Sequence, residues 1–371
     1  MRAGIWSLGL AAAVLSTVLT LPARGRLDTG SSESGQAPAA ATAGQGSGTW
    51  TANTRNRWRD DDRTPRVQLN LRTADDHDRW GFGVRVRDLS GLPEAALDGS
   101  AADVRFTLVR EAGTFTFTGS FSDGRGAGRY TFSASPVYAS AMAGLGFPAL
   151  PREQTMRLAV LDVTTTFVRD VRGAGQPARD LDEVVRFRIH GVSGAGIREL
   201  EALGFRDLSG DQLVKMRIHG ATPARIRELR AAGLAASDVD DVVRLRIHGV
   251  TPEFIAGLQR RDLAGLDADD YVRMRIHGVT LHEIDELRTL GYTGLDADDL
   301  VRFRIHGVRP SFIRDMRDLG FTAVDGDDLV KMRIHNVSAA FVREARADGL
   351  SIASPDDAVD LAIHGRRWRR R

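Results

Sequence analysis

Seven histidines at a fixed spacing are the residues of this sequence whose type and pattern could first suggest chemistry. Each lies in an Ile-His-Gly or Ile-His-Asn triplet, and the interval from one to the next never changes. They are His190, His219, His248, His277, His306, His335 and His364. A metal site needs two to four ligands that converge within a few ångströms, whereas packed helices lie about 10 Å apart. If the repeats are stacked helices, equivalent histidines cannot share one ion, and we predict neither a metal site nor a catalytic site.

The position of each histidine near the end of a predicted helix favours a structural role. A ring N–H there can satisfy an orphan carbonyl of the last turn, and a partial positive charge suits the helix dipole. The alternative is a response to pH, because histidine titrates near neutrality.

An arginine two residues before the histidine recurs in six units. These residues are Arg188, Arg217, Arg246, Arg275, Arg304 and Arg333. The helical period places them inside an apolar arc, where an arginine must be paired. We expect each to pair with an acid of an adjacent unit, and Arg275→Ala to cost about 3–5 kcal/mol. The alternative is a basic stripe for an anionic ligand.

Acidic clusters are the remaining candidates for a cation site. They are the runs Asp60-Asp61-Asp62 and Asp75-Asp76-His77-Asp78, and the Asp-x-Asp-Asp runs that begin at Asp267 and Asp296. Calcium loops bend at a glycine and supply several oxygen ligands, which the first two runs lack, so we interpret them as turns. The later runs suit the first turn of a helix. The segment His282-Glu283-Ile284-Asp285-Glu286 has Glu286 where a zinc-peptidase helix needs its second histidine, so it is not a zinc site.

The elements that position these residues are two short helices in each 29-residue unit. Helix A is expected to start ten residues before the histidine, at an N-cap with an acceptor three residues later. The N-caps are Asp180, Ser209, Asp238, Asp267, Asp296, Asp325 and Ser354. Helix B is capped by Ser193, Thr222, Thr251, Thr280 or Ser338 and ends at Gly204, Gly233, Gly291, Gly320 or Gly349. One unit carries Asp262 at that glycine position, so its loop is expected to differ.

Apolar residues cover a wide arc of helix A, as in Leu300, Val301, Phe303 and Ile305. An arc that wide needs neighbours on two sides, which stacked units supply. We therefore predict an α-solenoid of about eight helix pairs over residues 134–365. Ile276 is expected in its core, and Ile276→Ala to cost about 2–5 kcal/mol.

A second, smaller domain is expected at residues 49–133, where the apolar period is two. Val67, Leu69 and Leu71 alternate with polar residues, and so do four later segments. Gly- and Asp-rich turns separate them, which predicts an antiparallel meander of four or five strands. Because its last strand runs directly into the repeat, this β domain caps the array. The fold class is α+β.

The N-terminus predicts export. Residues 1–25 combine Arg2 with an apolar run from Ile5 to Leu21, as in a signal peptide; the alternative is a membrane anchor formed by residues 5–21. Residues 26–48 are interpreted as a flexible linker. The chain has no cysteine, which excludes disulfides and thiolate sites.

Charge says little about partners. The formal net charge is +2, so no field points to nucleic acid. The basic tail at residues 366–371 could touch an anionic membrane surface, where each basic group contributes on the order of 1 kcal/mol; the alternative is a solvated end.

The unit Val301-Arg302-Phe303-Arg304-Ile305-His306-Gly307-Val308, with the Thr251-Pro252-Glu253-Phe254-Ile255 segment, resembles a bacterial helical repeat of unassigned activity. The segment from Phe106 to Phe147 is similar to sequences found beside it. Such modules occur in secreted proteins and beside membrane zinc peptidases of the beta-lactam-sensor type. The resemblance covers about residues 65–364 and implies an extracytoplasmic sensing or interaction role. The zinc-binding helix of those peptidases is missing here, so their activity does not transfer.

These features together predict a non-catalytic, exported scaffold or sensing protein, periplasmic or extracellular. Extended repetition without a convergent catalytic group favours a protein or peptide partner and no cofactor. The alternatives are an enzyme with its site in the β domain, or a module that responds to pH or cations.

Overall fold

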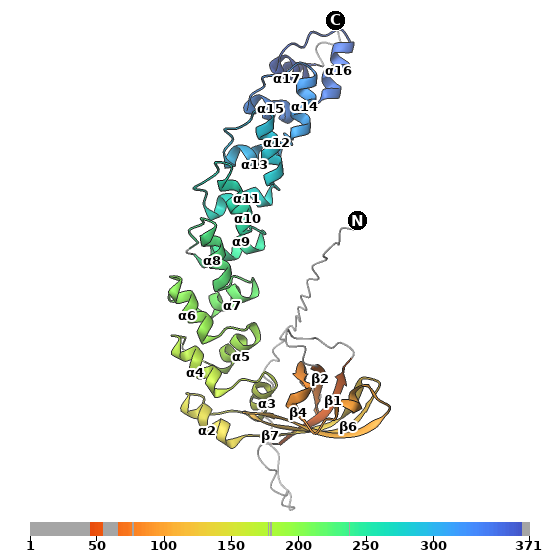
Figure 1. The fold of residues 1–371 in the computed structure, drawn as a ribbon, viewed down its shortest axis with the longest axis vertical. Coiled ribbons are helices and arrows are strands. Elements are labelled where there is room, and N and C mark those ends of the chain that lie inside the picture. The colour runs from red at the N-terminus through yellow and green to blue at the C-terminus, as the bar shows by residue number, and fades with distance from the viewer. Residues whose placement is uncertain are drawn as a thin grey trace, which may run out of the picture. The chain divides into compact units, whose positions relative to one another are not determined.

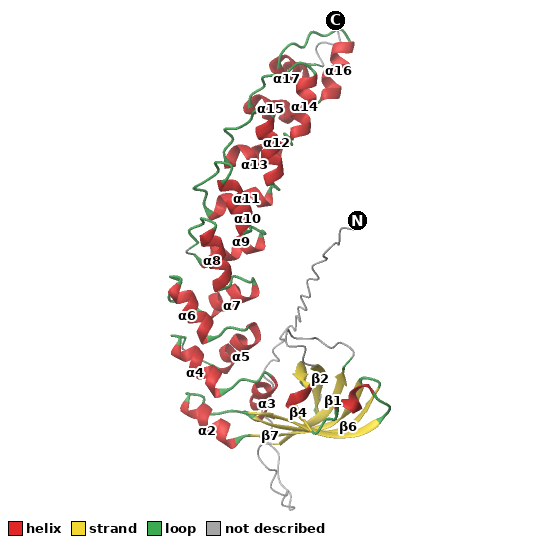
Figure 2. Cartoon of the chain, viewed as in Figure 1, coloured by secondary structure: helices red, strands yellow, loops and turns green. Residues whose placement is uncertain are grey.

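The structure is a computed structural model that describes residues 45–54, 66–75, 78–176, 178, 180–236 and 238–365. It is an α+β fold, in which an antiparallel sheet is followed by helices alone (Figure 2). The expected signal segment, most of the linker, the Asp60–Asp62 run and the basic tail lie outside the described residues.

Within these ranges seven strands form one antiparallel sheet in the order β3-β2-β1-β7-β6-β5-β4. The strands are β1 (Gln45–Asn53), β2 (Arg66–Thr73), β3 (Arg79–Arg85), β4 (Leu89–Ser90), β5 (Ala102–Arg110), β6 (Gly113–Ser122) and β7 (Arg125–Ala134). A 3-10 turn (Val86–Asp88) precedes β4, and the short helix α1 (Glu94–Asp98) follows it.

The expectation of a four- or five-stranded meander is wrong. The sheet gains the two-residue strand β4 and the strand β1, which starts at Gln45 and lies between β2 and β7. Strand β1 is rich in Gly, Ser and Thr and has only Trp50 and Ala52 as buried side chains of its alternating face, so its apolar period is too weak to read. The strand forms nevertheless, because β2 and β7 on its two sides make backbone hydrogen bonds with it.

Aromatic rings fill the inner face of the sheet. Trp50, at 1% exposure, meets Phe106 edge-on with ring centroids 5.3 Å apart, and Phe106 stacks on Phe117 at 4.7 Å. The Trp50 indole N–H donates to the Thr118 carbonyl at 3.1 Å. Burial raises the pKa of Tyr130, on the same sheet, to about 12.

From α2 onward two kinds of helix alternate, and they follow one another in chain order (Figure 1). The A helices carry the repeated histidine or its counterpart; they are α3 (Arg152–Val160), α5 (Leu181–His190), α7 (Gly210–Ile218), α9 (Val239–Ile247), α11 (Ala268–Ile276), α13 (Ala297–His306), α15 (Gly326–Ile334) and α17 (Pro355–His364). The B helices are α2 (Pro136–Gly144), α4 (Thr165–Gly173), α6 (Gly194–Ala202), α8 (Pro223–Ala231), α10 (Pro252–Gln259), α12 (Leu281–Thr289), α14 (Pro310–Asp318) and α16 (Ala339–Ala347).

Both helix starts form as the sequence predicts. All seven predicted N-caps of helix A accept a backbone N–H from the third helical residue. The reciprocal bond of a capping box forms in α7, α11, α13 and α17, so the short carboxylates Asp270 and Asp299 serve as well as Gln212. The predicted helix B caps are confirmed too, whereas Arg309, the N-cap of α14, makes no side-chain cap bond.

Left-handed residues end the helices from α2 to α16. After α9, Gly249 has a φ of 67°, and the Val250 N–H donates back to the Leu245 carbonyl at 2.9 Å, which is the Schellman arrangement. Asp262 takes a φ of 61° and its loop repeats the bonds of the glycine loops. The expectation of a different loop there is therefore wrong, because aspartate tolerates the left-handed region.

Each A helix from α5 to α15 contacts the next A helix, and each B helix from α2 to α14 contacts the next B helix. We call these two series the A row and the B row. Buried side chains of both rows, such as Phe187, Leu245, Ile255 and Ile313, belong to one continuous apolar core.

The sheet is joined to the first helices by specific polar contacts. Glu111, between β5 and β6, accepts the Thr165 backbone N–H at 2.9 Å at the start of α4. The Tyr138 hydroxyl of α2 donates to the Val163 carbonyl at 2.9 Å. The hairpin carboxylate thus adds a second acceptor at the N-terminus of α4, where the Thr164 side chain already accepts the Phe167 N–H.

Candidate interaction surface

The residue before each repeated histidine is an isoleucine, and in every unit it is exposed. The exposed fractions are Ile189 55%, Ile218 57%, Ile247 55%, Ile276 57%, Ile305 56%, Ile334 52% and Ile363 51%. The expectation that Ile276 and Ile305 belong to the core is therefore wrong. At about 100° per residue Ile276 lies about 40° from buried Val272 but only about 20° from exposed Asp269, so it stands at the margin of the buried arc.

A row of ion pairs runs beside these isoleucines. Three residues before each isoleucine from Ile189 to Ile334, an arginine or lysine pairs with the acid at the second position of the next A helix, and Arg157 of α3 does the same. The pairs are Arg157–Asp182, Arg186–Asp211, Lys215–Asp240, Arg244–Asp269, Arg273–Asp298, Arg302–Asp327 and Lys331–Asp356. The Lys215 pair measures 2.7 Å and the Arg273 pair 2.6 Å. Hydrogen bonding to Asp356 also raises the pKa of Lys331.

On each A helix from α5 to α15, three side chains therefore face solvent: an acid near the start, a base in the middle and an isoleucine near the end. We call the surface formed by these three residues of successive units the A-row surface. Sequence reasoning placed the acids correctly but paired them with the wrong arginines. The signal that could have found the pairs is the constant interval between opposite charges, which is the same from Arg157 to Asp182 as from Lys331 to Asp356.

The arginines two residues before the histidines are exposed or half-buried, so the expectation of buried pairs with the acids at helix A starts is wrong. The expected pairing with an acid of an adjacent unit is confirmed for two of the six, Arg188 with Asp162 at 3.4 Å and Arg304 with Glu283 at 3.2 Å. In four of them Nε donates to a backbone carbonyl at the end of the preceding A helix. These bonds are Arg188 to Leu161 at 2.9 Å, Arg217 to His190 at 3.3 Å, Arg304 to His277 at 3.0 Å and Arg333 to His306 at 3.4 Å. A guanidinium at a helix C-terminus satisfies an orphan carbonyl and suits the dipole, so the carbonyl is a partner for these four arginines whether or not an acid is also present.

The third residue of the preceding B helix precedes each of these arginines by the same interval, and its type varies from unit to unit. Phenylalanine lies under the guanidinium in three pairs, with 5.6 Å from Arg188 to the Phe167 centroid, 5.2 Å from Arg275 to Phe254 and 5.1 Å from Arg333 to Phe312. In one unit the residue is Glu283, which pairs with Arg304 at 3.2 Å. The two remaining units carry Gly196 and Arg225.

A second arginine series in the B row was missed by sequence reasoning. Arg172, Arg288, Arg317 and Arg346 each donate to a carbonyl at the end of the preceding B helix. Arg172 and Arg346 also lie over Phe147 and Phe321, with 4.8 Å and 5.2 Å to the ring centroids. Both rows therefore join consecutive units by the same arginine–carbonyl contact.

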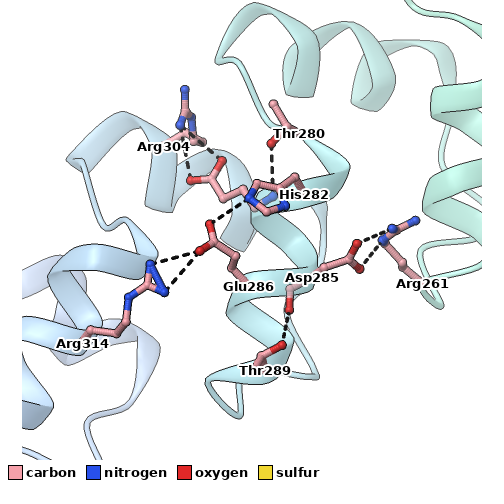
Figure 3. Close-up of polar contacts among 9 residues, drawn as sticks. Arg261, Thr280, His282, Asp285, Glu286, Thr289, Arg304 and Arg314 are labelled. Carbon is pink, nitrogen blue, oxygen red and sulfur yellow. Dashed lines mark hydrogen bonds and ion pairs between the residues drawn. The ribbon is translucent and has the colours of Figure 1, made fainter. Parts of the chain in front are cut away.

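The charged side chains of the α12 segment do not converge on one point: His282 and Arg314 contact Glu286, whereas Asp285 binds Arg261 (Figure 3). Glu286 binds Arg314 at 3.0 Å and lies 3.6 Å from the His282 ring. Asp285 accepts two hydrogen bonds from Arg261, which hold the pKa of Asp285 below its ordinary value. Within the described ranges no group of three or more His, Asp or Glu side chains could hold a metal ion.

The seven histidines occupy the last helical position or the C-cap of their A helices, as expected. The backbone carbonyls of His190, His277 and His306 accept the arginines described above. The role expected of the imidazole rings, and the alternative response to pH, stay predictions.

Of the acidic run at Asp75–Asp78, residues 76 and 77 lie outside the described residues. Asp78 itself sits in the β2–β3 turn, where its N–H donates to the Thr73 hydroxyl at 3.1 Å, as expected of a turn.

Comparison with protein-family models and with curated proteins gives no match for this chain. Across the part of the chain that is described, no helix is long and apolar enough to cross a membrane.

Proposed function

We propose that this chain is a non-catalytic interaction protein that presents the A-row surface to a protein or peptide partner. The observation that carries the proposal is the isoleucine before each histidine. It is the same residue in all seven units although it is at least half exposed, whereas the residue two positions earlier, buried in six of them, varies among Phe, Met and Leu. Core packing therefore does not explain why isoleucine recurs.

The finer architecture that we propose is an α-solenoid of eight helix pairs, capped at its N-terminal end by the sheet. The contacts between successive A helices and between successive B helices support it. The two arginine series support it as well, because each arginine joins a helix to the equivalent helix one unit earlier. Stacked units of this kind create extended binding surfaces.

The charges of the A-row surface favour a polypeptide over nucleic acid or an anionic lipid surface. Every base of the surface has an acid of the next unit beside it, as in Lys215–Asp240 at 2.7 Å and Lys331–Asp356 at 2.5 Å. Binding to phosphates relies on basic groups free to replace counterions. An apolar row flanked by neutralised charges is closer to the composition of a protein–protein interface.

Export remains part of the proposal. It rests on residues 1–25, whose apolar run after Arg2 is typical of a signal peptide. The rival idea of an enzyme site in the β domain has less support, because aromatic rings such as Trp50, Phe106 and Phe117 fill the described inner face of the sheet.

The test places a photo-crosslinking amino acid at Ile276 of the full chain in its native cells. The matched control carries it at His282, which is 84% exposed on α12, a helix of the B row. We expect a discrete adduct from position 276, a much weaker one from position 282, and loss of the adduct when Ile247 and Ile305 are changed to Asn. Equal labelling from both positions, or labelling that survives the two substitutions, would contradict the proposal.

A further inference from the structure

Gly196 occupies the place that a phenylalanine holds in three equivalent units. It precedes Arg217 by the same interval as Phe254 precedes Arg275 and Phe312 precedes Arg333. In those units the ring lies beneath the guanidinium, and two of the three rings are shielded from solvent, with Phe254 6% and Phe312 7% exposed, while Phe167 is half-buried. At Gly196 there is no side chain to lie under Arg217.

A pocket of about 40 Å³ is found at this place. Its wall is mostly apolar, and it includes Gly196, Ile197, Leu200, Leu213, Met216 and Arg217. The aliphatic side chains come from α6 and α7 and are buried, while Arg217 is exposed. The pocket has room for part of an aromatic ring. The side chain of the exposed Arg217 can cover the part of the ring that stays outside.

The backbone does not require glycine here. Gly196 lies in the first turn of α6 without a positive φ, and a Cβ built on it meets only the Ser193 hydroxyl, at 3.4 Å. Glycine lowers helix stability relative to almost any other residue. The position therefore tolerates a side chain and yet leaves the pocket open.

We propose that this pocket binds one aromatic side chain of the polypeptide partner, with the ring beneath the Arg217 guanidinium. The charge complementarity is that of the internal pairs, since a cation is attracted to the negative face of an aromatic ring. The apolar wall suits the edge of an aromatic ring, but it does not suit a charged or amide side chain. This inference rests on the proposed function and narrows it to a partner that carries an exposed phenylalanine, tyrosine or tryptophan.

The neighbouring unit fits the same picture. Arg225 replaces the phenylalanine there, and its guanidinium donates to the Val250 carbonyl at 3.2 Å and pairs with Glu228 at 3.0 Å. These polar contacts occupy the Arg225 side chain. The α12–α13 unit has a polar pocket at the equivalent place, lined by Thr280, Glu283 and Arg304. The mostly apolar wall is therefore what distinguishes the pocket at Gly196 from that one.

The experiment titrates the full chain, labelled at its methionine methyl groups, with N-acetyl-phenylalaninamide and follows the NMR signal of Met216. We expect a saturable shift, and at least a tenfold weaker response to N-acetyl-leucinamide. Gly196→Phe should abolish the shift and raise the melting temperature, because the new ring fills the pocket as Phe254 does in its own unit. Gly196→Ala is the matched control and should keep the response.

A saturable response that persists in Gly196→Phe would overturn the proposal, and so would the absence of any response in the unaltered chain. A response to toluene alone would also overturn it, because the site would then take a ring but not a residue of a polypeptide. The titration needs no partner, so its failure is distinct from failure of crosslinking at Ile276. The variant Phe254→Gly adds a second check, since it should create a similar response at Met274 beneath Arg275.

Discussion

Arg304 donates from its Nε to the carbonyl of His277 at 3.0 Å, and so closes the C-terminus of one A helix with the side chain of the next. The same guanidinium pairs with Glu283, whose side chain is only 11% exposed. One residue therefore serves as helix cap and as counter-ion across a joint between units. At the other joints the equivalent position holds a phenylalanine, Gly196 or Arg225 in place of the glutamate.

Removal of Arg304 should be more costly than removal of Arg217. Arg304→Ala leaves the nearly buried Glu283 without its partner, so we expect a loss of about 2–3 kcal/mol. Arg217→Ala loses mainly the bond to the His190 carbonyl, which contributes about 1 kcal/mol. Denaturant unfolding of both variants gives the comparison. Adding Glu283→Gln to Arg304→Ala should recover part of the loss; equal losses in the two single variants would show that Glu283 needs no counter-ion.

Truncation of the exposed isoleucine should leave stability nearly intact. Ile276 is 57% exposed, so we expect Ile276→Ala to cost less than about 1 kcal/mol. Met274, two residues earlier, is fully buried at 0%, and Met274→Ala should cost about 2–5 kcal/mol. Free energies of unfolding measured side by side test the assignment. A larger loss of stability from Ile276→Ala than from Met274→Ala would show that Ile276 belongs to the core after all.

A better N-cap on α14 should stabilise the array. Arg309 makes no side-chain cap bond, whereas Thr251 accepts the Phe254 N–H at 3.2 Å at the equivalent position of α10. Arg309→Thr should therefore gain about 1 kcal/mol, and Thr251→Arg should lose a similar amount. Thermal melting of the two variants checks this reciprocal pair. If both substitutions lowered the melting temperature, Arg309 would have a role beyond the cap position.

Asp170 should make stability depend on acid. Its hydrogen bond to Arg198 is the main cause that lowers its pKa, with help from the Gly194 backbone N–H. A carboxyl whose pKa is lower in the folded state stabilises the fold above its unfolded pKa of about 3.9. That contribution is lost as the pH falls from there through the folded value.

Asp170→Asn should consequently be less stable than the unaltered chain at pH 6, and the difference should shrink as the pH falls from the unfolded pKa of about 3.9 through the lower pKa of the folded state. Asp328 is the control of opposite sign, because burial and then the neighbouring Asp325 raise its pKa. Its contribution declines as the pH rises from the unfolded to the folded value, so Asp328→Asn should gain relative to the unaltered chain over that interval. Unfolding curves across the acid range measure both, and a pH-independent difference for Asp170→Asn would contradict the assignment.

Much of the local structure was set by short stretches of sequence. An N-cap such as Asp267, its acceptor Asp270 and a left-handed glycine such as Gly278 lie close together in the chain, and they fix where α11 begins and ends through backbone hydrogen bonds. The constant period of the repeat likewise predicted successive helix pairs. Strand β1 was not predicted, because it is held in the sheet by pairing with β2 and β7 and has no clear apolar period of its own.

Contacts between units were decided by the tertiary structure alone. The helical arc placed Ile276 among apolar residues and Arg275 deep inside, yet the isoleucine is exposed and the Arg275 guanidinium lies over Phe254 of another helix. The helical period tells on which side of a helix each residue lies. It does not tell how much of that helix's surface the neighbouring helices bury. Long side chains add to the difficulty, because an arginine can leave the arc in which its Cα lies and reach a carbonyl of the preceding unit, as Arg304 reaches His277. Whether a repeated residue is core or surface was therefore settled only when the units were packed against one another.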